Sequence, residues 1–69
     1  MIEVGGKYRH YKGTAYVVLA FAKHSETEEG LIIYQDIEHP EKVWARPLEM
    51  FEESVEWEGK TVPRFTKIS

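Results

Sequence analysis

The stretch AYVVLAFAKH, residues 15–24, decides the fold. It is rich in aromatic and β-branched residues, which favour a β-strand, and it is long for one flat strand. Both alternating faces are apolar: one has Val17, Leu19 and Phe21, and the other has Tyr16, Val18, Ala20 and Ala22. A strand that is apolar on both faces usually bends through the core of a small barrel. This stretch therefore predicts a bent central strand.

Shorter strand patterns surround this stretch, and turn residues such as Gly, Pro and Ser separate them. Pro47 suits the start of a helical turn that ends near Glu52, and Leu48, Phe51 and Val55 have the spacing to share one of its faces. Pro63 is expected on a sheet edge because it cannot donate to a strand ladder. The other predicted strands are residues 7–11, 31–37, 43–46, 54–57 and 61–65, with tight turns at 12–14 and 58–60.

These patterns predict an all-β fold, a small SH3-like barrel of about five strands with one short helical turn. An OB-like barrel is the alternative, although that fold is usually longer. The length of 69 residues permits a single domain, residues 1–69. The chain has no cysteine, which excludes disulfides and thiolate metal sites and fits a reducing compartment.

Charge and hydropathy limit the location and the partners. The longest apolar run, residues 15–22, is too short to span a bilayer, and the N-terminus lacks a secretory pattern, so we expect a cytoplasmic protein. The net charge is −3, and Glu49, Glu52, Glu53, Glu56 and Glu58 follow one another with no basic residue among them. Strong nucleic-acid binding is therefore not expected, because it requires a dense basic face. A small basic spot near residues 7–12 could still hold one anion.

The stretch His24-Ser25-Glu26 resembles the residues of a hydrolase, but side chains adjacent in sequence diverge and seldom form a triad. A turn accounts for more of it. Ser25 and Glu28 have capping-box spacing, and Gly30 suits a left-handed conformation before the next strand. This turn does not require a histidine at position 24. His24 is either a surface residue at a strand end or a partner for a group across the barrel.

The three histidines, His10, His24 and His39, show no metal-binding motif such as H-x-H or H-E-x-x-H. We therefore predict no metal site, no cofactor and no catalytic residue.

Aromatic and basic residues alternate in two strands. Tyr8 and His10 share one face of the first strand, Arg9 and Tyr11 share the other, and Trp44 and Arg46 share a face of the fourth. Core packing would equally account for the tyrosines and the tryptophan. The alternative is a concave ligand-binding surface, whose candidate residues are Tyr8, His10, Tyr11, His24, Trp44 and Arg46.

Six short motifs carry a family resemblance. They are G-x-Y-R-H-Y-K-G at 6–13, A-x-H-S-E-T at 22–27, Ile33-Tyr34-Gln35, W-x-R-P at 44–47, Met50-Phe51 and Pro63-Arg64-Phe65. With these motifs the chain resembles the short bacterial proteins of the family called domain of unknown function 1653. The resemblance implies a free-standing bacterial protein, and it brings no established activity, ligand or cofactor.

Two classes of function remain open. The first is a noncatalytic binding module that recognises a protein segment or a small anionic ligand through the aromatic and basic residues. The second is a small enzyme that uses His24 with Glu26 or His10 for acid–base chemistry. A water-excluding pocket is hard to build in so short a chain, which favours the module. An accessory domain that acts only within a larger complex is a third possibility.

Overall fold

The computed structural model describes residues 2–69, and it contains seven strands and one short helix. In chain order they are β1 (Lys7–His10), β2 (Ala15–Lys23), β3 (Gly30–Asp36), β4 (Val43–Pro47), α1 (Leu48–Glu52), β5 (Ser54–Trp57), β6 (Lys60–Pro63) and β7 (Phe65–Lys67). The prediction of an all-β domain with one helical turn is confirmed.

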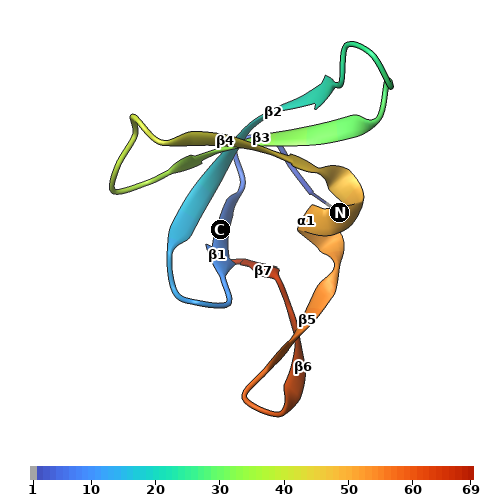
Figure 1. Ribbon diagram of the computed structural model, residues 1–69. Helices are drawn as coiled ribbons and strands as arrows, with labels where there is room; N and C mark the ends of the chain where they lie inside the picture. Colours follow the sequence, from blue (N-terminus) through green and yellow to red (C-terminus); the bar gives the residue numbers. More distant parts are fainter. Residues whose placement is uncertain (1) are drawn as a thin grey trace.

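Five strands form one antiparallel sheet in the order β4-β3-β2-β1-β7, and β5 and β6 form a separate hairpin. The sheet bends around the core, α1 lies on its open side, and the β5–β6 hairpin extends away from it (Figure 1). Within residues 2–69 no pairing joins β4 to β7, so the sheet is curved but open, with these two strands at its edges. The structure has seven strands where about five were predicted.

The long strand β2 contains an irregularity, as its length and composition suggested. Its register with β3 shifts between Val18 and Ala20. Because directly paired residues share a sheet face, the pairs Val18↔Tyr34 and Phe21↔Ile32 place Phe21 on the same face as Val18. The face assignment by simple alternation is therefore wrong beyond Val18, since a bulge reverses the side on which later residues lie.

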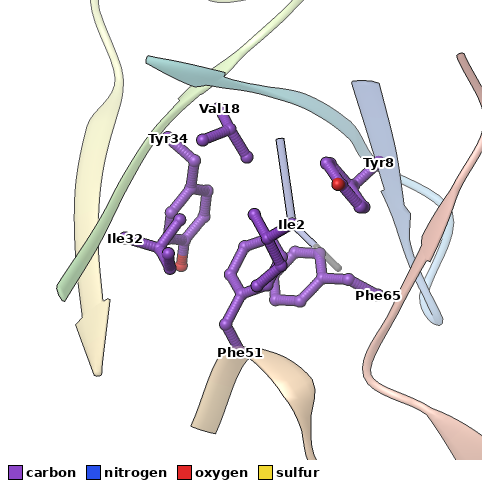
Figure 2. Packing of buried hydrophobic residues seen from close by; sticks show 7 residues of the cluster. All are labelled: Ile2, Tyr8, Val18, Ile32, Tyr34, Phe51 and Phe65. Atoms are coloured by element: carbon purple, nitrogen blue, oxygen red, sulfur yellow. The ribbon is translucent and has the colours of Figure 1, made fainter. Parts of the chain in front are cut away.

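The core lies between the curved sheet and α1 (Figure 2). The rings of Phe51, from α1, and Phe65, from β7, are stacked with centroids 4.0 Å apart and an interplanar angle of 5°. Phe51 is only 2% exposed, and burying one such side chain contributes roughly 1.5–3 kcal/mol. The buried apolar residues are Ile2, Tyr8, Val18, Ile32, Tyr34, Phe51 and Phe65.

Two local predictions near the C-terminus need correction. The helix begins at Leu48 and not at Pro47, and Leu48 remains 39% exposed, so Phe51 alone carries the helix into the core. Val55 lies on β5, outside the helix. The predicted strand 61–65 is two strands, because β6 pairs with β5 and β7 pairs with β1, with Arg64 between them.

Candidate ligand-binding site

The turn between β1 and β2 is fixed by the side chain of His10. Its Nδ1 accepts a hydrogen bond from the backbone N–H of Lys12 at 3.2 Å. The backbone N–H of Gly13 donates to the carbonyl of His10 at 2.8 Å, and Gly13 has a φ of 113°, which favours glycine. The imidazole of His10 is therefore held at the end of β1.

The turn between β2 and β3 uses His24 in the same way. Its Nδ1 accepts from the backbone N–H of Glu26 at 3.1 Å and of Thr27 at 3.3 Å. The left-handed residue is Glu28, with a φ of 61°, whereas Gly30 already pairs with Lys23 in the sheet. The backbone N–H of Glu28 donates to the carbonyl of His24 at 2.9 Å, which closes a single turn. The predicted capping box of Ser25 and Glu28 is wrong, because the His24 imidazole and not the Ser25 hydroxyl accepts from the N–H groups of this turn.

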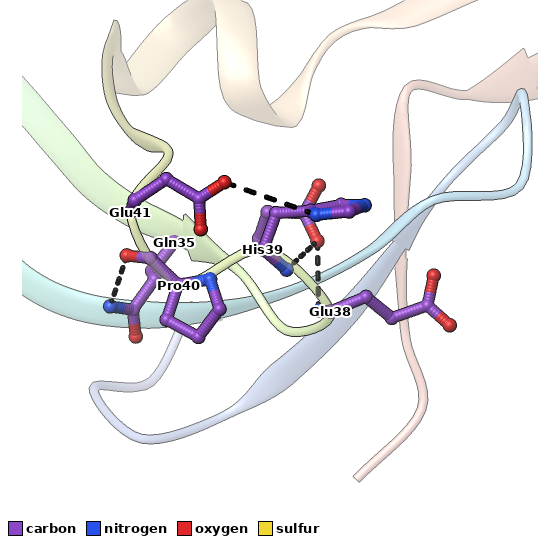
Figure 3. A network of polar contacts seen from close by, with 6 residues as sticks. Gln35, Glu38, His39, Pro40 and Glu41 are labelled. Atoms are coloured by element: carbon purple, nitrogen blue, oxygen red, sulfur yellow. Dashed lines mark hydrogen bonds and ion pairs between the residues drawn. The ribbon is translucent and has the colours of Figure 1, made fainter.

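The loop between β3 and β4 depends on a carboxylate. Oδ1 of Asp36, a buried residue, accepts from the backbone N–H groups of Glu38 at 2.9 Å and His39 at 3.0 Å. Gln35 Nε2 donates to the carbonyl of Pro40 at 2.8 Å, and these three bonds hold residues 38–40 of the loop to the end of β3 (Figure 3). This loop sets the position at which β4 begins.

An aromatic row connects the end of β1 to the core and to the hairpin. The His10 ring lies against the Tyr11 ring with centroids 4.4 Å apart, and it meets Phe65 edge-on at 5.1 Å. Tyr11 in turn meets Trp57 of the hairpin edge-on at 5.1 Å. The hairpin is thus joined to the sheet through Tyr11, and His10 lies at the centre of the row.

Arg46 lies over the same region from β4. Its Nε donates to the hydroxyl of Tyr34 at 3.2 Å, and its guanidinium carbon lies 5.9 Å from the centre of the Phe65 ring. Among the described residues, none accepts a hydrogen bond from its Nη atoms. Arg46 is therefore oriented by its Nε while its two terminal nitrogens remain able to bind a ligand.

Arg64 is fixed at the base of the hairpin. Its Nη2 lies 2.5 Å from Oε1 of Glu53, and its backbone N–H donates to the Glu53 carbonyl at 3.0 Å. Its Nε is buried and has no hydrogen-bond partner among the described residues. The backbone N–H of Tyr11 donates to the Arg64 carbonyl at 3.0 Å, which ties this residue to the end of β1.

Three cations lie near His10. Partial burial lowers the pKa of His10, and the nearby charges of Arg46, Arg64 and Lys12 lower this pKa further. Because its Nδ1 accepts a backbone hydrogen bond, the neutral imidazole carries its proton on Nε2 and can donate from there. We call His10, Tyr11, Lys12, Arg46 and Arg64 the His10–Arg46 surface.

The structure brings some predicted site residues together and separates others. Tyr8 is a core residue, 5% exposed, whose hydroxyl accepts from the backbone N–H of Glu3 at 3.0 Å. Trp44 shares the Arg46 face of β4 and is 49% exposed, and no aromatic contact involves it within residues 2–69. Tyr11 follows the end of β1, and its ring lies against that of His10. His24 lies in the turn at the other end of β2.

Sequence reasoning missed several residues of this region. Arg64 and Tyr34 stand within two of the family motifs, and that was the signal available for them. Lys12 was assigned to a turn and to a basic spot near residues 7–12, but not to the ligand-binding residues, and Trp57 was assigned only to the closing hairpin. Arg64 and Trp57 were missed because they reach the end of β1 from segments distant in sequence, and for Arg64 that convergence depends on the pairing of β7 with β1.

The residues proposed for the small enzyme, His24 with Glu26 or His10, do not come together in the structure. The Nδ1 of His24 is engaged by its own turn, and Glu26 contributes its backbone N–H and not its carboxylate. His10 and His24 lie in turns at opposite ends of β2. In the described part of the chain, no three His, Asp or Glu side chains are grouped to hold a metal ion. No helix there is long and apolar enough to span a bilayer.

The fold and this surface define a small all-β domain with a basic, aromatic patch, and comparison with known proteins gives its family. The family described as protein of unknown function (DUF1653) matches residues 6–67, so the chain belongs to this family. The chain is also similar to a DUF1653 protein from Bordetella bronchiseptica, whose crystal structure gives a TM-score of 0.82 at 32% identity. The match covers 93% of this chain and 85% of that chain. The comparison with curated proteins found no match.

Proposed function

We propose that this protein is a noncatalytic binding module that recognises a carboxylate of a partner through the His10–Arg46 surface. The observation that carries the proposal is the gathering of three cations around His10. Lys12 Nζ lies 5.8 Å from the centre of the Tyr11 ring, and the Arg46 guanidinium carbon lies 5.9 Å from that of Phe65, and both rings contact His10. Arg64 is bonded through its carbonyl to the backbone N–H of Tyr11. Only Arg64 among these cations has an acidic partner within residues 2–69. In a protein with a net charge of −3, a local excess of positive charge favours an anionic ligand.

The available hydrogen-bond donors support the same ligand class. Arg46 presents its two Nη atoms, and a planar guanidinium can bind both oxygens of a carboxylate. Neutral His10 presents Nε2–H, because Nδ1 is already an acceptor. Its lowered pKa keeps His10 in this neutral state near pH 7. The two side chains therefore offer donors without requiring a proton transfer.

The surroundings of His10 support binding over acid–base chemistry. A general base needs a substrate site beside it and usually a group that orients it. The orienting group of His10 is a backbone N–H, and its neighbours are cations that oppose its protonation. Glu53, the acidic side chain that contacts Arg64, forms an ion pair with it.

The proposal is tested by NMR titration of the ¹⁵N-labelled protein with succinate, at an ionic strength held constant with sodium chloride. We expect saturable shifts of the amide signals of His10, Tyr11 and Arg46. Arg46→Gln should remove these shifts while the remaining spectrum keeps its dispersion. Arg9→Gln is the matched control, because within residues 2–69 the exposed Arg9 side chain bonds only to the carbonyl of Gly13 in the adjacent turn. Shifts that are absent, or unchanged in Arg46→Gln, would show that the surface is not the ligand site.

A further inference from the structure

The strand β4 is one edge of the five-stranded sheet. An edge strand presents unpaired backbone N–H and C=O groups on its outer side, which is a template for another strand. Val43, Trp44 and Ala45 of β4 are exposed.

The alternation of hydrogen-bonded pairs between β3 and β4 identifies the backbone N–H and C=O groups of β4 that face outward. In an antiparallel pair, opposed residues alternate between those that bond to each other and those that do not. The backbone N–H of Asp36 donates to the carbonyl of Lys42 at 3.0 Å, which makes this a bonded pair in the β3–β4 register. Trp44 and Arg46 therefore bond to β3, and Val43 and Ala45 point their N–H and C=O groups outward. Pro47, which has no N–H, falls at a position that needs none.

The usual protection of a sheet edge is missing at the centre of β4. Edges are commonly blocked by proline, by inward-facing charges or by a bulge. Residues 43–45 contain no proline and no charged residue, and their register with β3 is regular. Arg46, which faces the core side, and Pro47 protect only the end of the strand.

The side chains beside this edge determine which side chains an added strand should carry. Residues paired directly across strands share a face, so an added strand would place alternate side chains next to Trp44 and Arg46. This is the core side of the sheet, since these two residues pair with Tyr34 and Ile32. Residues 42–47 contain Lys42 and Arg46 and no carboxylate. A second copy of β4 would therefore bring no acidic partner to Arg46, whereas an acidic segment would.

We propose that the edge of β4 receives an extended, acidic segment of a partner protein as an additional antiparallel strand. One residue of the segment pairs with Ala45 through backbone hydrogen bonds. The preceding residue, opposite Arg46, is acidic, and the following residue, opposite Trp44, is apolar. The acidic preference rests on the proposed function, whereas the strand pairing depends only on the free edge.

The test uses a blocked peptide, acetyl-Thr-Thr-Glu-Thr-Val-Thr-Thr-amide, and amide hydrogen exchange measured by NMR on the full chain. Binding should slow exchange of the Val43 and Ala45 amides by about tenfold or more at saturation, because each gains a backbone partner. The Trp44 amide, already bonded to β3, should change little.

Two changes remove the outward hydrogen bonds without altering the β3–β4 ladder. N-methylation of the peptide's central threonine removes the donor to the Ala45 carbonyl, and Ala45→Pro removes the outward N–H of the protein. Each should weaken binding by about tenfold, the effect of a hydrogen bond at the upper end of the usual range. Equal binding of the N-methylated peptide would overturn the proposal, even if Ala45→Pro fails to fold.

The outcomes separate this inference from the proposed function. If succinate shifts His10 and Arg46 but the peptide leaves Val43 and Ala45 unprotected, the strand addition is wrong and the anion site stands. If a peptide with Gln in place of Glu protects the two amides equally well, the strand addition stands and the acidic preference is wrong. If the two amides are protected without peptide in a concentration-dependent way, the occupant is a second copy, and the proposal is overturned.

Discussion

His10 and His24 perform the same structural task at opposite ends of β2, since each Nδ1 accepts a backbone N–H from the residue two positions later. Asp36 does the same with its carboxylate at the next loop. All three loops of the β1–β4 meander are thus fixed by a side-chain acceptor at the strand end. His10 differs from His24 in its surroundings, because only His10 lies among Lys12, Arg46 and Arg64.

Replacing His24 should destabilise the protein without affecting ligand binding. His24→Ala removes the acceptor for two backbone N–H groups, and we expect a loss of about 0.5–1.5 kcal/mol in the free energy of unfolding. Urea denaturation measures this loss. His24→Asn, which retains a side-chain acceptor, should recover part of it, and a lack of any difference between the two variants would contradict the assigned role.

Replacing Ser25 should have almost no effect. No side-chain hydrogen bond of Ser25 is present within the described residues, so Ser25→Ala should change the free energy of unfolding by less than about 0.5 kcal/mol. The same urea experiment measures it. A loss as large as that of His24→Ala would restore the capping role that the sequence suggested.

The lowered pKa of His10 makes stability depend on pH. The unfolded chain has a histidine pKa of about 6.5, so the unfolded state binds more protons than the folded state between that value and the lower folded pKa. The free energy of unfolding should therefore fall as the pH drops from 7.5 to 5.5. His10→Asn, which keeps an acceptor for the turn, should show a smaller fall over this interval. An equal fall in both proteins would assign the effect to other groups.

Gly6 should not tolerate a side chain. A Cβ atom at Gly6 would lie 3.0 Å from the Glu3 carbonyl oxygen and 3.1 Å from Cε1 of the buried Tyr8 ring. We expect Gly6→Ala to cost about 1–3 kcal/mol, the usual range for overpacking. Gly30→Ala is the control, because the nearest atom there, Cβ of Leu48, is at an ordinary contact distance of 3.9 Å. Thermal and urea unfolding of both variants would check the contrast.

Binding to random duplex DNA should be weak at physiological salt. The acidic residues Glu49, Glu52, Glu53, Glu56 and Glu58 are exposed on and after α1, and they oppose a phosphate backbone. Fluorescence anisotropy with a labelled duplex measures this affinity. Submicromolar binding would contradict the expectation and would also point to phosphate as the ligand of the His10–Arg46 surface.

Local patterns predicted most of the fold. Alternation and turn residues located the strands, and the length and apolar faces of residues 15–24 indicated the bend in β2. The position of the bulge was not predictable, because it depends on how β2 packs against β3, and Phe21 was therefore assigned to the wrong face. The break at Arg64 was missed for a similar reason, since the residues on its two sides pair with different strands.

The candidate site was only partly predictable. His10 and Arg46 were identified from their aromatic and basic neighbours in sequence. Tyr8 was expected at the site, but its ring lies in the core, where it meets Phe51 edge-on at 5.6 Å. Arg64 reaches the site because the chain leaves the hairpin to pair with β1. Such long-range convergence has no local sequence signal.

The anion site is tested most directly by the pKa of His10 with and without succinate. NMR follows this pKa through the carbon-bound protons of the imidazole ring. An anion bound beside His10 favours the protonated imidazole, so we predict that succinate raises the pKa of His10 toward its ordinary value. The rise should persist in Arg9→Gln and disappear in Arg46→Gln. A His10 pKa that is the same with and without saturating succinate in the unaltered protein would contradict the proposed function.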